Sequence, residues 1–347
     1  MTKDKSIFIK NIYYMLSYAF TVLRHSHYAD IETEKFEHIH NLFAAILSKG
    51  IAQQLKHGLY REYRSVTEEM PAFRGKIQMT GTIRSRIAQK RTLTCEYDEL
   101  SENNLYNQIL KTTVFLLLRH AQVDEIYKVS LKKAMLYFSG IDTIAPASIR
   151  WSSIRFHRNH QNYQMLIGIC QLIIEGMLQT TEQGEHRLAA FVDEQHMCRL
   201  YEKFILEYYR RHYPQLKANA SRIAWALDDG FDTMLPAMQS DIMLTCDEKT
   251  LIIDAKYYGK TTQTQYGVHT LHSNNLYQIF AYVKNLAAAG GEVSGMLLYA
   301  RTNETVQPDQ NYWMSGNRIG VKTLDLNCTF TNISEQLNSV ANAFLGS

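Results

Sequence analysis

The sequence predicts an α/β protein with two domains: an α+β N-terminal domain (residues 1–185) and a C-terminal α/β domain (residues 186–347). The chain has 347 residues, 46% of them hydrophobic, and that length favours two domains over one. Before residue 181, helical patterns surround one strand-and-turn region. After a polar stretch with an apolar insert, TEQGEHRLAAFVDEQH (181–196), the pattern turns from helix towards strands. We therefore expect the domain boundary within this stretch.

The N-terminal domain is expected to hold four helices around one extended region. Tyr60, Tyr63 and Val66 favour extended structure, and Pro71 and Gly75 punctuate the region after them. A strong helix is expected at residues 101–122, with Ser101 as its N-cap and acidic Glu102 in its first turn. The predicted helices span residues 8–24, 36–56, 101–122 and 161–180, and the strand-and-turn region spans residues 59–83.

The C-terminal domain is expected to run helix, strand, strand, helix, strand. Its first helix ends before Pro214, and its strands are short apolar runs with polar links between them. This order is typical of a small α/β unit. The predicted helices span residues 197–212 and 273–288, and the predicted strands span residues 240–245, 251–257 and 295–301.

Composition excludes several classes of protein. The formal net charge is only +3, which neither requires nor excludes a nucleic-acid partner, because a local basic patch can exist in a balanced total. Five widely spaced cysteines without a CxxC pair indicate reduced thiols and no disulfide framework or zinc site. No secretory signal pattern opens the sequence, and the longest apolar stretch, 114–118, is too short to span a bilayer. We expect a cytoplasmic protein without a membrane partner.

Two aspartates and a lysine form the main candidate site. Side chains alternate along a strand, so Asp254 and Lys256 share one face of the strand that begins with Leu251-Ile252-Ile253. Asp241 lies 13 residues earlier, and CDEKT (246–250) between the two strands reads as a hairpin turn. The pairing brings Asp241 towards Asp254, so two carboxylates and one ammonium group converge at one edge of a sheet.

This set of groups suits Mg²⁺-dependent phosphodiester hydrolysis. Mg²⁺ prefers carboxylate, carbonyl and water oxygens, and Asp241, Asp254 and the Ala255 carbonyl can supply the first two kinds. A bound metal lowers the pKa of its water and neutralises charge on the phosphate. Lys256 can orient the attacking water or stabilise charge in the transition state. The alternative is that a buried Asp–Lys ion pair is purely structural.

The flanking helices offer further candidates. Glu202 and Glu207 border the apolar face of the helix before the site on opposite sides, so helical periodicity does not choose between them. We take Glu202 as the candidate and a solvated glutamate as the alternative. In the helix after the site, Gln278 and Tyr282 lie four residues apart on one face. Gln278 is a candidate for holding water or a DNA phosphate, and a surface amide is the alternative.

Together, Asp241, Asp254-Ala255-Lys256 and Gln278-x₃-Tyr282 resemble the PD-(D/E)xK nuclease superfamily, with the proline displaced to Pro236. Longer stretches look like the McrC family, the nuclease subunits of McrBC restriction systems, and they run from residue 11 to about residue 300. These stretches are NIYYMLSYAF (11–20), RGKI (74–77), DELSENNLYNQILK (98–111), DAKYYG (254–259) and HSNNLYQIFAY (272–282).

The resemblance implies a Mg²⁺-dependent endonuclease with Asp241, Asp254, Lys256, Gln278 and Glu202 as site residues. It also implies double-stranded DNA with modified cytosine as substrate, and an AAA+ GTPase oligomer, McrB, as a partner that contacts the N-terminal domain. The sequence holds no GxxxxGK[ST], in agreement with a separate GTPase subunit. A basic cluster, Arg84, Arg86, Lys90 and Arg91, is either a solvated face or a contact to DNA or to the partner's nucleotide.

Two other functions stay open at this point. One is a GTPase activator whose nuclease fold is an inactive scaffold, although Asp241, Asp254 and Lys256 are intact. The other is an autonomous DNA repair nuclease, which the N-terminal stretches disfavour.

Overall fold

The computed structural model describes residues 3–4, 7–156, 160–182, 194–257, 262–265, 268–301 and 307–346. Contacts divide the chain into two compact units. The sheet unit comprises Met1–Leu42 and Glu175–Ser347, and the helical unit comprises Phe43–Ile174. This grouping differs from the single cut near residue 185 that the sequence predicts. That cut lies outside the described residues, so the boundary between functional domains stays a prediction. Tyr258 and Gly259 of the DAKYYG stretch also lie outside them.

The helical unit is built from α3 (Ile39–His57), α5 (Leu105–Arg119), α6 (Glu125–Met135) and α7 (Gln161–Glu182), of which α3 begins and α7 ends in the sheet unit. The predicted helices at residues 36–56, 101–122 and 161–180 are thereby confirmed, with shifted ends, and α6 was not predicted. The helices bury one apolar stripe each, which is the usual source of helix stability in a domain. Fully buried members are Phe43, Ile46, Leu47, Ile51, Ile109, Leu110, Val114, Leu117, Leu131, Met165, Leu166 and Ile169.

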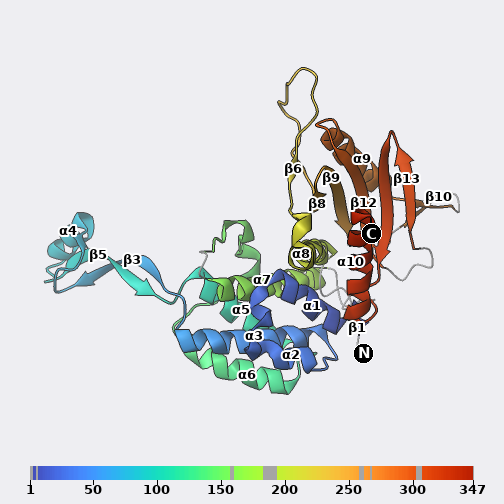
Figure 1. Ribbon diagram of the computed structural model, residues 1–347. Helices are drawn as coiled ribbons and strands as arrows, with labels where there is room; N and C mark the ends of the chain where they lie inside the picture. Colours follow the sequence, from blue (N-terminus) through green and yellow to red (C-terminus); the bar gives the residue numbers. More distant parts are fainter. Residues whose placement is uncertain are drawn as a thin grey trace. The chain divides into compact units, whose positions relative to one another are not determined.

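The same unit carries a long antiparallel ribbon, here called the arm (residues 62–101). Strands β3 (Glu62–Met70) and β5 (Leu93–Ser101) pair over nine residues, and β4 (Lys76–Ile77) and α4 (Met79–Ile87) lie between them in sequence. Figure 1 shows α4 at the far end of this ribbon. The predicted strand-and-turn region is correct up to residue 77, but its last residues form the helix α4.

Ser101 does not cap helix α5, so that prediction is wrong. Ser101 is the last residue of β5, paired with Glu62, and Asn104 is the N-cap. The Asn104 side chain accepts a hydrogen bond from the Asn107 amide at 3.2 Å. The pairing with β3, about 40 residues earlier in the chain, holds Ser101 in an extended conformation, and local sequence does not reveal such a partner.

The arm exposes apolar side chains. Most of β3, which lies at an edge of this small sheet, is solvent-exposed, whereas Thr94 and Cys95 of β5 are buried and β5 contacts α4 and β4. On α4, Met79, Ile83 and Ile87 follow one another at intervals of four and are 64%, 51% and 78% exposed. Phe73, in the turn before β4, is 63% exposed. A contiguous apolar stripe of this kind is typical of an interaction surface.

The sheet unit is built on a five-stranded sheet in the order β13-β14-β12-β9-β8. Its three inner strands are parallel, and both edge strands are antiparallel to their neighbours. Residues 251–255 are consecutively buried, as expected for a parallel strand covered on both faces. The strands are β8 (Ile242–Cys246), β9 (Lys249–Lys256), β12 (Glu292–Ala300), β13 (Gln310–Met314) and β14 (Asn317–Leu324).

Helix α9 (Ser273–Ala287) covers one face of the sheet. Its Ile279 and Val283 pack against a cluster that includes Ile252, Leu297 and Tyr299. Helices α8 (Glu194–His212) and α10 (Phe330–Leu345) contact strands β8, β9 and β14 and are joined by hydrogen bonds from Tyr208 and Tyr209 to α10. The five predicted elements are confirmed as α8, β8, β9, α9 and β12, although unpredicted short strands at residues 222–223, 238–239, 262–265 and 268–271 lie between them in sequence. Strands β13 and β14 and helix α10 were not predicted either. The α/β class is confirmed.

Helix α1 (Ile9–Ala19) belongs to the sheet unit and packs on α8. The Asn11 side chain donates hydrogen bonds to the carbonyls of Leu326 and Cys328, each at 2.8 Å. The Tyr14 ring stacks on Phe330 of α10 at 4.4 Å. The helix predicted at residues 8–24 ends at Ala19 and continues as a 3-10 turn, Thr21–Arg24.

Short elements complete the described chain. They are β1 (Lys3–Asp4) with β2 (Ile7–Phe8), α2 (Ala29–Thr33), β6 (Arg222–Ile223) with β7 (Met238–Gln239), β10 (Thr262–Gln265) with β11 (Val268–Leu271), and 3-10 turns at Ser26–Tyr28, Leu136–Phe138, Pro146–Ser148, Trp151–Ser153 and Pro214–Leu216. Within the described ranges, no helix is both long and apolar enough to cross a bilayer.

Candidate active site

The β8–β9 hairpin brings the two predicted aspartates together. Ile242 pairs with Ile253, so one further step of the antiparallel register sets Asp241 opposite Asp254. The Asp241 carboxylate accepts a hydrogen bond from the backbone amide of Ala255 at 2.9 Å, which fixes it against the end of β9. Asp254 is only 1% exposed. The sheet therefore holds two carboxylates side by side where β8 begins and β9 ends.

Lys256 completes this pair. Residues two apart on a strand share a face, and the Lys256 ammonium lies 3.0 Å from Oδ1 and 2.9 Å from Oδ2 of Asp254. The lysine side chain is 12% exposed, so its charge is almost as sheltered as that of its partner. The three residues that the sequence selected thus form one buried cluster.

The cluster has two carboxylates but only one ammonium group, so its negative charge is not fully compensated. Burial raises the pKa of Asp254, and repulsion from Asp241 raises it further, against the opposing effect of Lys256. Burial likewise raises the pKa of Asp241, while Lys256 and the Ala255 amide act in the opposite direction. Two buried carboxylates with one ammonium group favour either a proton or a further cation.

Glu202 faces this cluster and Glu207 does not. Burial raises the pKa of Glu202, repulsion from Asp241 adds to the rise, and Lys256 opposes it, so Glu202 lies within electrostatic reach of both. Glu207 forms an ion pair with Arg210, one turn further along α8, at 2.7 Å on the exposed side of the helix. The two glutamates that periodicity left equivalent are therefore in different surroundings.

Gln278 lies on α9 and is half-buried. Its amide donates a hydrogen bond to the Tyr282 hydroxyl at 2.8 Å, so the predicted pair is joined within its own helix. One turn earlier, Asn275 is buried and donates to the hydroxyl of Tyr299 at 3.0 Å. Tyr299 pairs with Lys256 in the parallel β9–β12 register. Helix α9 therefore faces the strand ends that carry the cluster.

In the described parts of the chain, no group of three or more His, Cys, Asp or Glu side chains is arranged to hold a metal ion by itself. A site for Mg²⁺ does not need one, since this ion keeps several waters and accepts backbone carbonyls. Asp241, Asp254 and the Ala255 carbonyl are oxygen donors at one strand end, and the surplus of buried negative charge is what a divalent cation would neutralise. The donor set fits Mg²⁺.

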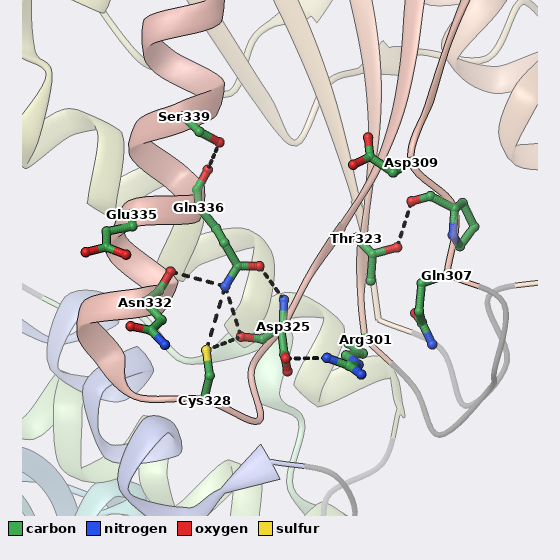
Figure 2. Close-up of a pocket in the computed structure, with 11 residues that line it drawn as sticks. Arg301, Gln307, Asp309, Thr323, Asp325, Cys328, Asn332, Glu335, Gln336 and Ser339 are labelled. Atoms are coloured by element: carbon green, nitrogen blue, oxygen red, sulfur yellow. Dashed lines mark hydrogen bonds and ion pairs between the residues drawn. The ribbon is translucent and has the colours of Figure 1, made fainter.

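A cavity of about 630 Å³ lies at the end of β12 and β14 and beside the start of α10 (Figure 2). Arg301 pairs with Asp325 at 2.5 Å, and Gln336 of α10 accepts a hydrogen bond from the Asp325 amide at 2.9 Å. The lining holds three carboxylates (Asp309, Asp325 and Glu335) and one guanidinium group. The excess of carboxylates over guanidinium groups disfavours binding of a DNA phosphate in this cavity. The ion pair and the hydrogen bond of Asp325 instead hold the loop between β14 and α10.

Cys198, which the sequence pattern did not select, also lies beside the candidate site. Its thiol lies 3.1 Å from a Glu202 carboxylate oxygen and 3.8 Å from the Ala255 carbonyl oxygen. The signal was present, because Cys198 precedes Glu202 by four residues and residues at that spacing are neighbours on a helix.

Comparison with known proteins gives a consistent set of relatives. The family described as "McrBC 5-methylcytosine restriction system component" matches residues 3–300. The chain is 29% identical over 342 residues, 97% of its own length and 98% of the relative's, to the type IV methyl-directed restriction enzyme EcoKMcrBC of Escherichia coli K12.

Among solved structures, similarity is found to a chain of a half-complex from a tetradecameric assembly of Thermococcus gammatolerans McrB AAA+ hexamers with bound McrC. The TM-score is 0.52 at 21% identity, covering 96% of this chain and 76% of the other. At this identity the match concerns the fold alone.

Proposed function

Because this chain belongs to the family of McrBC 5-methylcytosine restriction system components, as the McrC resemblance in its sequence predicted, we propose that it is the DNA-cutting subunit of such a system. Its substrate is double-stranded DNA that contains methylated cytosine, and its reaction is Mg²⁺-dependent hydrolysis of a phosphodiester bond. The observation that carries the proposal is the buried cluster of Asp241, Asp254 and Lys256 at one strand end.

The geometry supports a role for each residue. Asp241, Asp254 and the Ala255 carbonyl would hold the Mg²⁺ ion. When bound, the ion supplies a water of lowered pKa and neutralises charge on the scissile phosphate. Lys256, now 2.9 Å from Asp254, orients the attacking water or stabilises the charge that develops on the phosphate. The low exposure of the cluster strengthens these electrostatic interactions relative to those in water.

The flanking helices supply the supporting groups. Glu202 would help to hold the metal through a water molecule, and its electrostatic interactions with Asp241 and Lys256 support this role. Gln278 holds the nucleophilic water or a DNA phosphate, on a helix that packs against β9 and β12. Losing Glu202 should then weaken the use of Mg²⁺, whereas losing Gln278 should lower the rate at every Mg²⁺ concentration, because an amide adds no charge at the ion.

We further propose that this subunit works with an AAA+ GTPase oligomer and stimulates its GTP hydrolysis. The chain has no GxxxxGK[ST] sequence, so GTP binding falls to the partner. Partner binding is assigned to the N-terminal part, residues 1–185. The exposed apolar side chains of the arm support this assignment, since a solvated ribbon with Met79, Ile83 and Ile87 on its terminal helix is suited to burial against another protein.

The basic residues after RGKI lie on the same arm. Arg84 and Arg86 are exposed on α4, and Lys90 pairs with Glu69 of β3 at 2.9 Å. A solvated face and a contact to the partner or to DNA both agree with these positions.

The test is cleavage of methylated DNA by the complete complex with GTP. Parent protein should cut with Mg²⁺ and not with EDTA, and Asp254→Asn should lower the cutting rate by more than about 100-fold while leaving GTP hydrolysis by the complex intact. Asp247→Asn is the matched control, because it makes the same change in the hairpin turn of the same two strands.

Cleavage in EDTA, or normal cutting by Asp254→Asn, would refute the proposed site. Stimulated GTP hydrolysis without cutting by the parent protein would instead identify a GTPase activator with an inactive nuclease fold.

A further inference from the structure

We propose that Cys198 is a positioning residue of the candidate active site, whose thiol holds Glu202 towards the metal-binding carboxylates and ties helix α8 to strand β9. The inference rests on the proposed function, because it concerns the surroundings of the Mg²⁺ site. It assigns a residue that neither the catalytic motif nor the charge pattern of the sequence selects.

The geometry of the thiol carries the inference. Cys198 and Glu202 stand one turn apart on α8, and Sγ lies 3.1 Å from Glu202 Oε1. The same sulfur lies 3.8 Å from the carbonyl oxygen of Ala255, on the strand that bears Asp254 and Lys256. A thiol has one hydrogen, and the shorter contact gives it to the carboxylate. The longer contact places the sulfur against the strand carbonyl that we propose as a metal ligand.

The thiol acts as a donor and not as a charged group. The 3.1 Å contact to a carboxylate oxygen fits a protonated thiol, which donates its hydrogen to Glu202 and adds no negative charge to a cluster that already has an excess. A protonated, partly buried thiol is also a poor nucleophile, so a hydrogen-bonding role fits Cys198 better than a reactive one.

The thiol is one of three groups that favour the charged form of Glu202. Asp241 repels the Glu202 carboxylate, while the Cys198 hydrogen bond, Lys256 and Arg199 stabilise it. The thiol hydrogen bond opposes a turn of the side chain away from Asp241. Residues that orient the groups around a metal typically change metal affinity by about 10–100-fold when they are lost.

The experiment measures Mn²⁺ binding directly. Mn²⁺ is a spectroscopic probe for such oxygen sites, and the unbound ion is counted by its electron paramagnetic resonance signal with the full-length chain. Cys198→Val removes the donor and replaces the thiol by a somewhat larger apolar side chain, and it should raise the Mn²⁺ dissociation constant about 10-fold. Cys198→Ser restores a donor and should bind within about 3-fold of the parent protein.

Cys328→Ala is the matched control. Cys328 is another partly buried thiol in the sheet unit, bonded to the Asp325 carbonyl at 3.0 Å, and its loss should leave Mn²⁺ binding unchanged. In cleavage assays of the complete complex, Cys198→Val should raise the Mg²⁺ concentration that gives half the maximal rate and leave the plateau rate near that of the parent.

Parental Mn²⁺ binding by Cys198→Val would overturn the inference. Equal weakening by Cys198→Ser would overturn it too, because sulfur itself, and not its hydrogen bond, would then be required. Failure of the proposed function looks different: the parent protein would bind no Mn²⁺ at a saturable site, or Asp254→Asn would bind it as well as the parent does.

Discussion

Removal of the Asn11 side chain should destabilise the sheet unit by about 2–4 kcal/mol. Asn11 is 3% exposed, and its amide donates to the carbonyls of Leu326 and Cys328, both at 2.8 Å. In Asn11→Ala the Leu326 carbonyl is left buried without this donor, at a cost of about 1–3 kcal/mol, and the partly buried Cys328 carbonyl loses about 0.5–1.5 kcal/mol. Lys10→Ala, on the exposed side of the same helix, is the control and should change stability by less than about 0.5 kcal/mol.

The assay is urea unfolding, monitored by hydrogen exchange in the peptides that cover β14 and α10. With a urea dependence of about 2 kcal/mol per molar, the loss lowers the midpoint of these peptides by roughly 1–2 M. A fragment of residues 186–347 should fail to fold stably for the same reason, because it lacks α1 and uncovers Phe330. Equal midpoints for Asn11→Ala and Lys10→Ala would refute the argument that α1 is a structural part of this unit.

Three further changes test other parts of the structure. Gly295→Ala sets a Cβ atom 2.7 Å from an apolar side chain of α9, so it should lower the free energy of unfolding by about 1–3 kcal/mol; an unchanged melting temperature would contradict this packing. Gly75 has a φ of +68°, and a Cβ atom at this position would clash with a carbonyl oxygen of β5. Gly75→Ala should therefore distort the arm and lower the rate at which the GTPase partner hydrolyses GTP. Gly58→Ala is the control, because Gly58 also has a positive φ but its Cβ would meet open space, so this rate should stay unchanged. Burial lowers the pKa of His212, whose ring nitrogen lies 2.7 Å from the Tyr18 hydroxyl, so the folded state favours the neutral ring. The melting temperature should therefore fall as the pH drops below about 6.5, because the unfolded state then binds the proton more readily. His212→Gln should make the melting temperature less dependent on pH in this range.

Periodicity predicted the elements around the candidate site because their signals are local. The apolar run before Asp254 and the two-residue alternation to Lys256 define a buried strand, and a short polar turn defines the hairpin to Asp241. The structure brings these three residues together. Glu202 needed more than a helical wheel, because only the strand beneath α8 distinguishes it from Glu207.

The elements that the sequence analysis missed depend on distant partners. Ser101 has the residue type and the acidic neighbour of an N-cap, but pairing with Glu62 extends β5 to include it. Strand β14 is buried because it pairs in parallel with β12, which its own sequence does not show. The assignment of α1 to the sheet unit rests on contacts between residues more than 300 positions apart, such as Asn11 and Leu326.

The chain order of the sheet unit also sets the timing of its assembly. Helix α1 ends at Ala19, while α10, against which Tyr14 stacks, ends at Leu345. At roughly 5–20 residues per second, α1 waits on the order of half a minute for these partners, and the whole helical unit leaves the ribosome in the meantime. The surface that we propose for the GTPase partner lies in β3, α4 and β5, which precede β8 and β9 in the chain, so it is synthesised before the strands that carry Asp241 and Asp254.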